Sequence, residues 1–87
     1  MKIKDGFILR EIIGTWVIVP IGERIIEFSG LTTLNKTGAF LWQKLENEIT
    51  KEELLKAVIN EFEIDDTTAK KDVEEFVCEL MYKGLIK

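Results

Sequence analysis

Hydrophobic residues in the first third of the chain fall in short runs, without the spacing of a helix. Gly14 and a turn around Pro20 separate three such runs, which cover residues 7–13, 15–19 and 24–28. β-branched and aromatic residues dominate the runs, and this composition fits a pleated sheet. The short connections between them predict a three-stranded antiparallel meander.

A first helix is predicted over residues 35–47, where hydrophobic residues begin to recur every three or four positions. Residues 31–33 are expected only to bridge the sheet to this helix. Asn35 is a good N-cap, because its side-chain oxygen can accept a hydrogen bond from an unpaired backbone amide. Gly38 is expected to let the helix pack closely on the sheet. The apolar face consists of Ala39, Trp42 and Leu45.

Two further helices are predicted from their capping residues. Thr50 and Glu53 have the spacing of a capping box, and Asp65 or Asp66 can cap the third helix. Gly84 stands where a helix commonly ends in the left-handed conformation. The core stripe of the third helix is expected to be Ala69, Val73, Phe76 and Leu80. The last two hydrophobic residues are expected to fold back onto the core, and these are Leu85 and Ile86.

Strands followed by helices in 87 residues predict a single α+β domain over residues 1–87. No hydrophobic run approaches the roughly 20 residues that span a bilayer. The N-terminal residues also lack the pattern of a signal peptide. We therefore expect a cytoplasmic protein without a membrane partner.

Charge and residue chemistry narrow the function further. The chain has 12 Lys and Arg residues against 16 Asp and Glu residues, a net charge of −4, whereas nucleic acid requires a basic surface. Cys78 is the single cysteine and there is no histidine, so the usual zinc ligands and the usual general base are missing. We expect no nucleic-acid partner, no metal, no cofactor and no enzymatic activity.

Four segments together resemble the PqqD family, whose members recognise precursor peptides. The first is residues 34–42, Leu-Asn-Lys-Thr-Gly-Ala-Phe-Leu-Trp, which resembles the family signature Leu-Asn-x-Thr-Gly-Ala-x-x-Trp. The others follow in the family's order, at residues 50–55, 72–76 and 80–86. The resemblance covers nearly the whole chain, and the order and spacing of the segments make it specific.

The resemblance implies a fold and a binding mode. The fold would be a three-stranded antiparallel sheet followed by three helices, similar to a winged helix-turn-helix. The domain would bind the leader segment of a ribosomally made precursor peptide and present it to a separate modifying enzyme, often a radical SAM enzyme. The leader would add as a strand beside the third strand, in a groove shared with the third helix. Such a module acts in natural-product biosynthesis and performs no chemistry itself.

This mode makes the third predicted strand and the third helix the candidate peptide-binding site. An exposed strand edge offers unpaired amides and carbonyls to an incoming chain, and neighbouring pockets select its side chains. The candidate residues are Arg24, Ile25, Ile26, Glu27, Phe28, Lys70, Val73, Glu74, Phe76, Val77 and Met81. Val73 and Phe76 are also expected in the core stripe. One flank of the helix carries Lys70, Glu74, Val77 and Met81, and the other carries Asp72, Phe76, Glu79 and Lys83. The sequence leaves open which flank faces the groove.

Two other function classes compete with this interpretation. A small winged-helix DNA-binding regulator would share the fold, but its recognition helix would be basic, whereas the helices here carry mixed charge. An assembly subunit could pair two copies through the sheet edge as a homodimer. The identity of the peptide and the chemistry installed on it cannot be inferred from the sequence.

Overall fold

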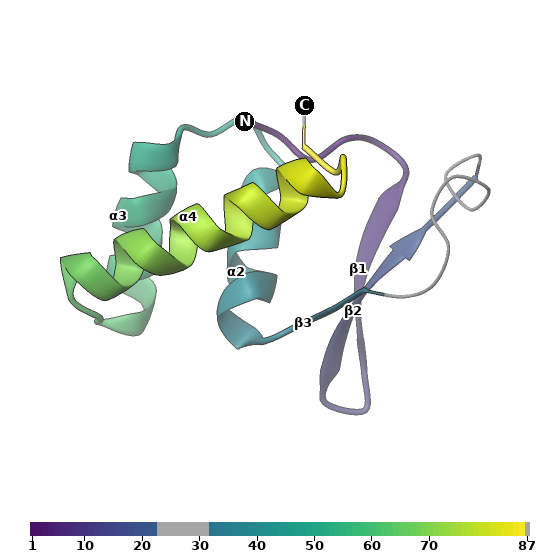
Figure 1. The fold of residues 1–87 in the computed structure, drawn as a ribbon. Coiled ribbons are helices and arrows are strands. Elements are labelled where there is room, and N and C mark those ends of the chain that lie inside the picture. The colour runs from purple at the N-terminus through teal and green to yellow at the C-terminus, as the bar shows by residue number, and fades with distance from the viewer. Residues whose placement is uncertain (23–31, 87) are drawn as a thin grey trace.

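A computed structural model of the chain describes residues 1–22 and 32–86. Within these residues an antiparallel sheet of three strands is followed by three helices, as predicted (Figure 1). The elements are β1 (Phe7–Ile12), β2 (Thr15–Pro20), β3 (Thr32–Leu34), α2 (Lys36–Leu45), α3 (Lys51–Phe62) and α4 (Asp66–Tyr82). The α+β class is confirmed, and the likeness to a winged helix-turn-helix stays a prediction.

β1 and β2 form a hairpin with a two-residue turn. Ile12 pairs with Thr15, so Ile13 and Gly14 make the connection. Both turn residues have positive φ, 48° and 74°, which is the geometry of a type I′ turn. Glycine adopts it freely, but a β-branched isoleucine is strained there. Ile13 is 99% exposed, so the folded protein gains little packing in return.

A strand, β3, lies where the sequence predicted only a connection. β3 pairs antiparallel with β2, with Leu34 opposite Trp16 and Thr32 opposite Ile18. The prediction that residues 31–33 only bridge the sheet to the first helix was therefore wrong. β3 has three residues, too few to show an alternating pattern that could reveal it. The strand predicted at residues 24–28 lies outside the described residues.

The predicted N-caps are confirmed. Asn35 Oδ1 accepts a hydrogen bond of 2.7 Å from the Gly38 amide, and α2 then ends at Leu45, two residues before its predicted end. Asp65, the first of the two candidates, caps α4 by accepting from the Thr68 amide at 3.4 Å. Short polar side chains thus fix where these helices begin.

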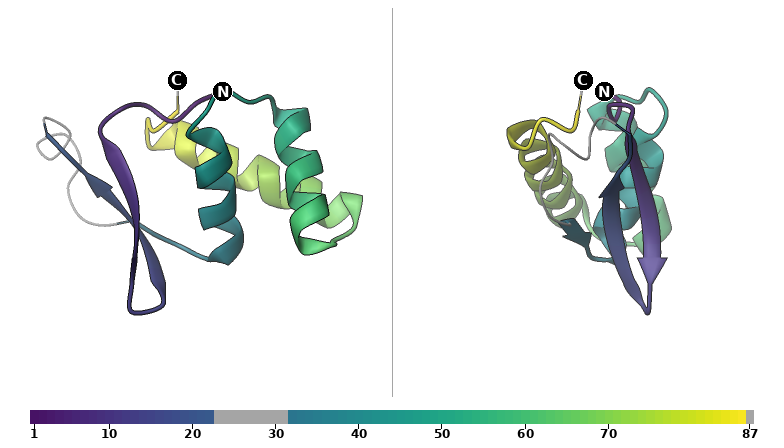
Figure 2. Two further views of the ribbon diagram at one scale, coloured as in Figure 1. Left: turned by 180° about the vertical axis from the view of Figure 1, so that it is seen from behind. Right: turned by 90° about the vertical axis from the view of Figure 1, so that its right-hand side faces the viewer.

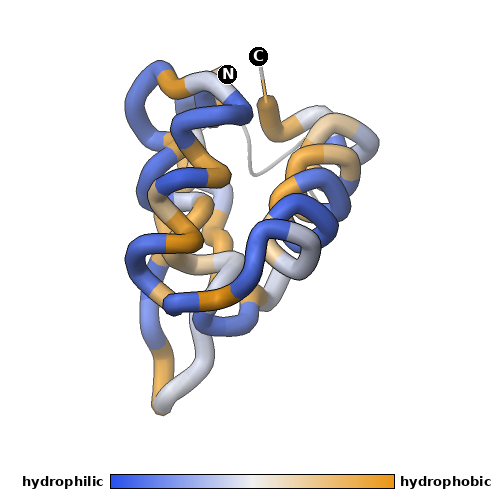
Figure 3. Tube along the Cα trace, turned by 90° about the vertical axis from the view of Figure 1, so that its left-hand side faces the viewer, coloured by the Kyte–Doolittle hydropathy of each residue, from blue (hydrophilic) through white to orange (hydrophobic). Residues whose placement is uncertain are grey.

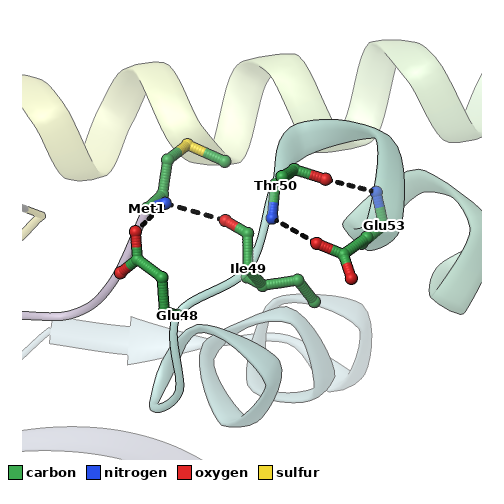
Figure 4. Close-up of polar contacts among 5 residues, drawn as sticks. All are labelled: Met1, Glu48, Ile49, Thr50 and Glu53. Carbon is green, nitrogen blue, oxygen red and sulfur yellow. Dashed lines mark hydrogen bonds and ion pairs between the residues drawn. The ribbon is translucent and has the colours of Figure 1, made fainter.

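A capping box and the amino terminus meet at the start of α3 (Figure 4). The Glu53 amide donates to Thr50 Oγ1 at 3.1 Å, and the Thr50 amide donates to Glu53 Oε1 at 3.0 Å. The Met1 amine donates to the Ile49 carbonyl at 2.7 Å and lies 3.2 Å from Glu48 Oε1. The segment that connects α2 to α3 is therefore held by the Met1 amine and by the capping box.

The end of α4 returns the chain to the core as predicted. Gly84 has a φ of 73°, and its amide donates to the Met81 carbonyl while the Leu85 amide donates to the Leu80 carbonyl. These two bonds are those of a Schellman motif. Leu85 and Ile86 are buried, and Ile86 forms an antiparallel bridge with Ile3.

The core lies where α4 crosses α2 and α3. α4 runs in front of both helices in Figure 1 and behind them in the left view of Figure 2. Along the helices in Figure 3, hydrophobic and hydrophilic segments alternate within each turn, which allows one face of each helix to be buried. The largest fully buried side chains are Trp42, Ile18, Leu41, Leu45, Leu54, Leu80 and Leu85. In the described part of the chain, no helix is long and apolar enough to cross a membrane.

Candidate functional site

A hollow of about 200 Å³ lies between the start of α2 and the middle of α4. β3 leads into this place, because Leu34 is its last residue and Asn35 caps α2. Among the described residues β3 pairs with β2 alone. The hollow therefore begins at Asn35, one residue after β3, and no residue of β3 itself lines it. The lining residues are Asn35, Thr37, Gly38 and Leu41 from the α2 side, and Asp72, Glu75, Phe76 and Glu79 from α4.

At this hollow the Phe76 side chain of α4 packs on Gly38 of α2. A Cβ added to Gly38 would lie 3.3 Å from Phe76 Cε1 and 3.2 Å from Asn35 Oδ1. It would also lie 3.5 Å from Leu34 Cβ, so the predicted contact with the sheet is present. The sequence did not predict the contact with α4. Phe76 is half-buried and packs against the core, which gives the hollow an apolar wall.

The α4 side of the hollow is acidic. Asp72, Glu75 and Glu79 all line it, and no lining residue is Lys or Arg. Lys83 Nζ lies 3.1 Å from Glu79 Oε1, one helical turn further along. Asp72 and Glu75 form no ion pair with any described residue. Uncompensated carboxylates beside an apolar wall favour a ligand that is both hydrophobic and cationic.

The residues predicted on α4 do not lie together. Lys70, Val73 and Glu74 line a different hollow of about 210 Å³, shared with Lys51, Glu52 and Leu55 of α3. Val73 and Val77 are 1% and 4% exposed and belong to the core. Met81 is 58% exposed and lines neither of the two hollows. Only Phe76 of the predicted α4 residues lines the hollow near β3.

The predicted residues Arg24, Ile25, Ile26, Glu27 and Phe28 lie outside the described residues. The sequence did not identify Asp72, Glu75 and Glu79 as site residues. Two of them belong to the flank that includes Phe76, and the spacing of 72, 76 and 79 could have identified that flank. Nothing in the sequence showed that this flank, rather than the other, faces the strand.

A larger hollow, of about 460 Å³, is lined by Leu34 of β3 together with residues of β1, β2, α2 and α3. Its aromatic lining comes from Trp16, Phe40 and Phe62, and the rings of Phe40 and Phe62 meet edge to face at 5.3 Å. Lys44 Nζ lies 5.5 Å from the centre of the Phe40 ring. α4 contributes no residue to this hollow, so it is not the groove between a strand and the third helix.

The described residues show no constellation that suggests catalysis. They contain no group of three or more potential metal ligands, and Cys78 is an exposed free thiol. A backbone hydrogen bond with Thr50 lowers the pKa of Glu53, and the side-chain hydrogen bond with Thr68 lowers the pKa of Asp65. Both carboxylates are helix caps, so their lowered pKa values reflect local structure.

Comparison with protein families matches residues 15–86 to the family described as coenzyme PQQ synthesis protein D (PqqD). A comparison with curated proteins finds no match. Among solved structures, the chain is similar to TbiB1 in complex with the TbiA(beta) leader peptide. That match has 25% identity and a TM-score of 0.76, and covers 100% of this chain and 95% of TbiB1.

The fold is also similar to that of lasso peptide synthetase B1 complexed with the leader peptide. The identity is 19% and the TM-score 0.72, with 97% of this chain and 93% of the synthetase chain covered. At this identity the similarity supports the fold alone. The arrangement of sheet and helices described above therefore recurs in a protein of distant sequence.

Proposed function

We propose a function from one premise: this chain belongs to the coenzyme PQQ synthesis protein D (PqqD) family. The protein is a peptide-binding module that recognises the leader segment of a ribosomally synthesised precursor peptide. It presents that peptide to a separate modifying enzyme and performs no chemistry itself. The observation that carries the proposal is the hollow of Phe76 and the α4 carboxylates beside β3, in a fold similar to a leader-peptide complex.

In the proposed binding mode the leader adds as a strand along the edge of β3. Main-chain hydrogen bonds to a strand supply affinity with little demand on sequence, and side-chain pockets supply selectivity. The hollow beside β3 supplies such a pocket, with Phe76, Leu41 and Gly38 as its apolar part. Residues 24–28, which precede β3 in the chain, remain proposed peptide-binding residues.

The other candidates on α4 have different parts in this proposal. Val73 and Val77 position the helix, because both are buried in the core. Lys70 and Glu74 lie in the hollow between α3 and α4, and Met81 is exposed outside both hollows. We therefore propose that the peptide contacts the flank of Phe76, because this flank lines the hollow near the end of β3.

The partner in this proposal is a separate modifying enzyme. The family resemblance points to a radical SAM enzyme, and the similar structures come from proteins bound to leader peptides.

We infer that the module acts in the cytoplasm, where a ribosomal product is available before export. Pairing of two copies through the β3 edge is the rival use of the same edge.

Titration of fluorescently labelled precursor peptides tests this function. The peptides are taken from short reading frames next to the gene, and each is compared with a scrambled version. We expect saturable binding of one native peptide, and loss of about tenfold in affinity for Phe76→Ala, since a large contact side chain typically contributes 1 kcal/mol or more. Met81→Ala, an exposed residue on the same helix, should bind like the wild type.

Circular dichroism must show that both variants are folded, because Phe76 also packs against the core. Equal loss of binding in the two variants would contradict a site at the hollow near β3. Failure of every native peptide to bind better than its scrambled version would contradict the proposed function.

A further inference from the structure

We propose that the groove near β3 selects a basic leader segment, in which a hydrophobic residue is flanked by Lys or Arg. This inference rests on the proposed function and specifies the class of peptide that the site takes. The hydrophobic residue would enter the hollow against Phe76 and Leu41, and the basic residues would face the carboxylates of α4.

The distribution of charge around the hollow carries the proposal. Its α4 side presents Asp72, Glu75 and Glu79, and its α2 side presents the uncharged Asn35 and Thr37. Only Glu79 has a cationic neighbour among the described residues, at 3.1 Å from Lys83. Two carboxylates are therefore left to pair with an incoming peptide.

These carboxylates lie beside the apolar patch formed by Phe76 and Leu41. A hydrophobic peptide residue that packs on this patch brings its sequence neighbours close to the carboxylates, so the charge of those neighbours affects binding. A Lys or Arg beside the inserted hydrophobic residue would gain a partner. An Asp or Glu at the same position would be repelled, and this repulsion excludes unsuitable peptides.

The hollow between α3 and α4 provides an internal comparison. It is lined by Lys51 and Lys70 as well as by Glu52 and Glu74, so its charges balance. A peptide seated there would experience no comparable preference for one sign of charge. The choice of basic peptides is thus specific to the flank of α4 that faces α2 and the end of β3.

Two charge reversals at adjacent residues of α4 test the inference. Glu75→Lys changes the hollow near β3, and Glu74→Lys makes the same change in net charge in the hollow shared with α3. The full-length wild type and both variants are screened against an immobilised library of short peptides. Each position of the library is varied over hydrophobic, basic and acidic residues.

We expect the wild type to enrich peptides with Lys or Arg next to a hydrophobic residue, and to bind them more weakly as salt concentration rises. Glu75→Lys should weaken binding of the selected peptide by about tenfold, since a reversal removes an ion pair and adds repulsion. Glu74→Lys should change the affinity less than about twofold, because Glu74 is exposed to solvent and lines the hollow shared with α3 instead of the one near β3.

The other possible results of the screen distinguish a failure of this inference from a failure of the proposed function. Enrichment of neutral or acidic peptides by the wild type, or equal effects of the two reversals, would overturn the preference for basic peptides and leave peptide binding intact. A wild-type protein that enriches no peptide would contradict the proposed function, and with it the inference.

Discussion

At the scale of single residues, the turn at the tip of the hairpin contains a residue that lowers the stability of the fold. Ile13 has a φ of 48° and is almost fully exposed, in a turn whose second residue is Gly14. A non-glycine residue in this conformation costs roughly 1–3 kcal/mol, and a β-branched side chain is among the least suited. The turn keeps its shape because twelve strand residues pair on both sides of it.

Ile13→Asn is therefore expected to stabilise the protein. The change creates the Asn-Gly sequence that a type I′ turn prefers and removes no buried contact, so the free energy of unfolding should rise by about 1 kcal/mol. Urea denaturation measures the difference. Ile12→Asn is the control, because Ile12 lies in β1 with its side chain half exposed, and this variant should be less stable than the wild type. If Ile13→Asn were less stable than the wild type, the backbone conformation of Ile13 would not be a source of strain.

The capping box at α3 predicts a dependence of stability on pH. The hydrogen bond with Thr50 lowers the pKa of Glu53 below its ordinary 4.5, so the folded state favours the carboxylate. Its contribution is present above the ordinary pKa and is lost as pH falls through the lowered value. Glu53→Ala should therefore be less stable than the wild type at neutral pH.

In acid, well below pH 4.5, the stabilities of the wild type and Glu53→Ala should converge, as followed by urea denaturation across pH. Glu52→Ala, which removes a carboxylate from the same helical turn but outside the capping box, controls for the interaction with the helix dipole. A difference for Glu53→Ala that persists unchanged into acid would exclude the capping bond as its cause.

At the scale of elements, the helices could be predicted from the sequence because their ends are specified locally. Asn35, Thr50 and Asp65 each bond to an amide three residues later, and Gly84 ends α4 in the left-handed conformation. β3 could not be predicted in this way, since three residues next to a helix cap carry no periodic signal. Its identity as a strand depends on pairing with β2, a contact between segments about sixteen residues apart.

The candidate site could be predicted only in part, for the same reason. Hydrophobic spacing identified most of the core face of α4, including Val73, but it assigned Phe76 to this face, whereas Phe76 is half-buried and Val77 is buried in the core. Which flank faces β3 depends on how α4 crosses α2, and the close approach of Phe76 to Gly38 fixes that crossing. A contact between residues 38 positions apart leaves no pattern in a single sequence.

Two proline substitutions in β3 should separate folding from binding. Backbone amides of successive strand residues point to opposite edges, so one of Thr32 and Thr33 directs its amide toward β2 and the other toward the edge away from β2. Proline lacks the amide. One variant should unfold at lower urea concentration, and the other should stay folded but lose affinity for the leader peptide.

Urea denaturation and peptide titration of both β3 variants decide the matter. Two variants that fold and bind like the wild type would rule out strand addition at β3. Two equally unstable variants would show that β3 has no edge available to a partner.

At the scale of the whole molecule, the balance of charge argues against duplex DNA as the partner. The net charge is −4, and the flank of α4 at the candidate site is acidic. A surface that binds duplex DNA gains affinity by neutralising phosphates with Lys and Arg. For this acidic domain the electrostatic contribution to the free energy of DNA binding is unfavourable. The same flank is suited to a basic peptide, so fold and charge together favour the peptide-binding function.

The most direct measurement is chemical-shift mapping of isotope-labelled protein during titration with a native leader peptide. Binding at the proposed groove predicts perturbed amides in residues 32–38 and along α4 from Asp72 to Glu79. The amides of α3 that line the other hollow, Lys51, Glu52 and Leu55, should change little. Perturbations centred on α3, with β3 and the Phe76 flank unaffected, would contradict the account and place the peptide in the hollow between α3 and α4.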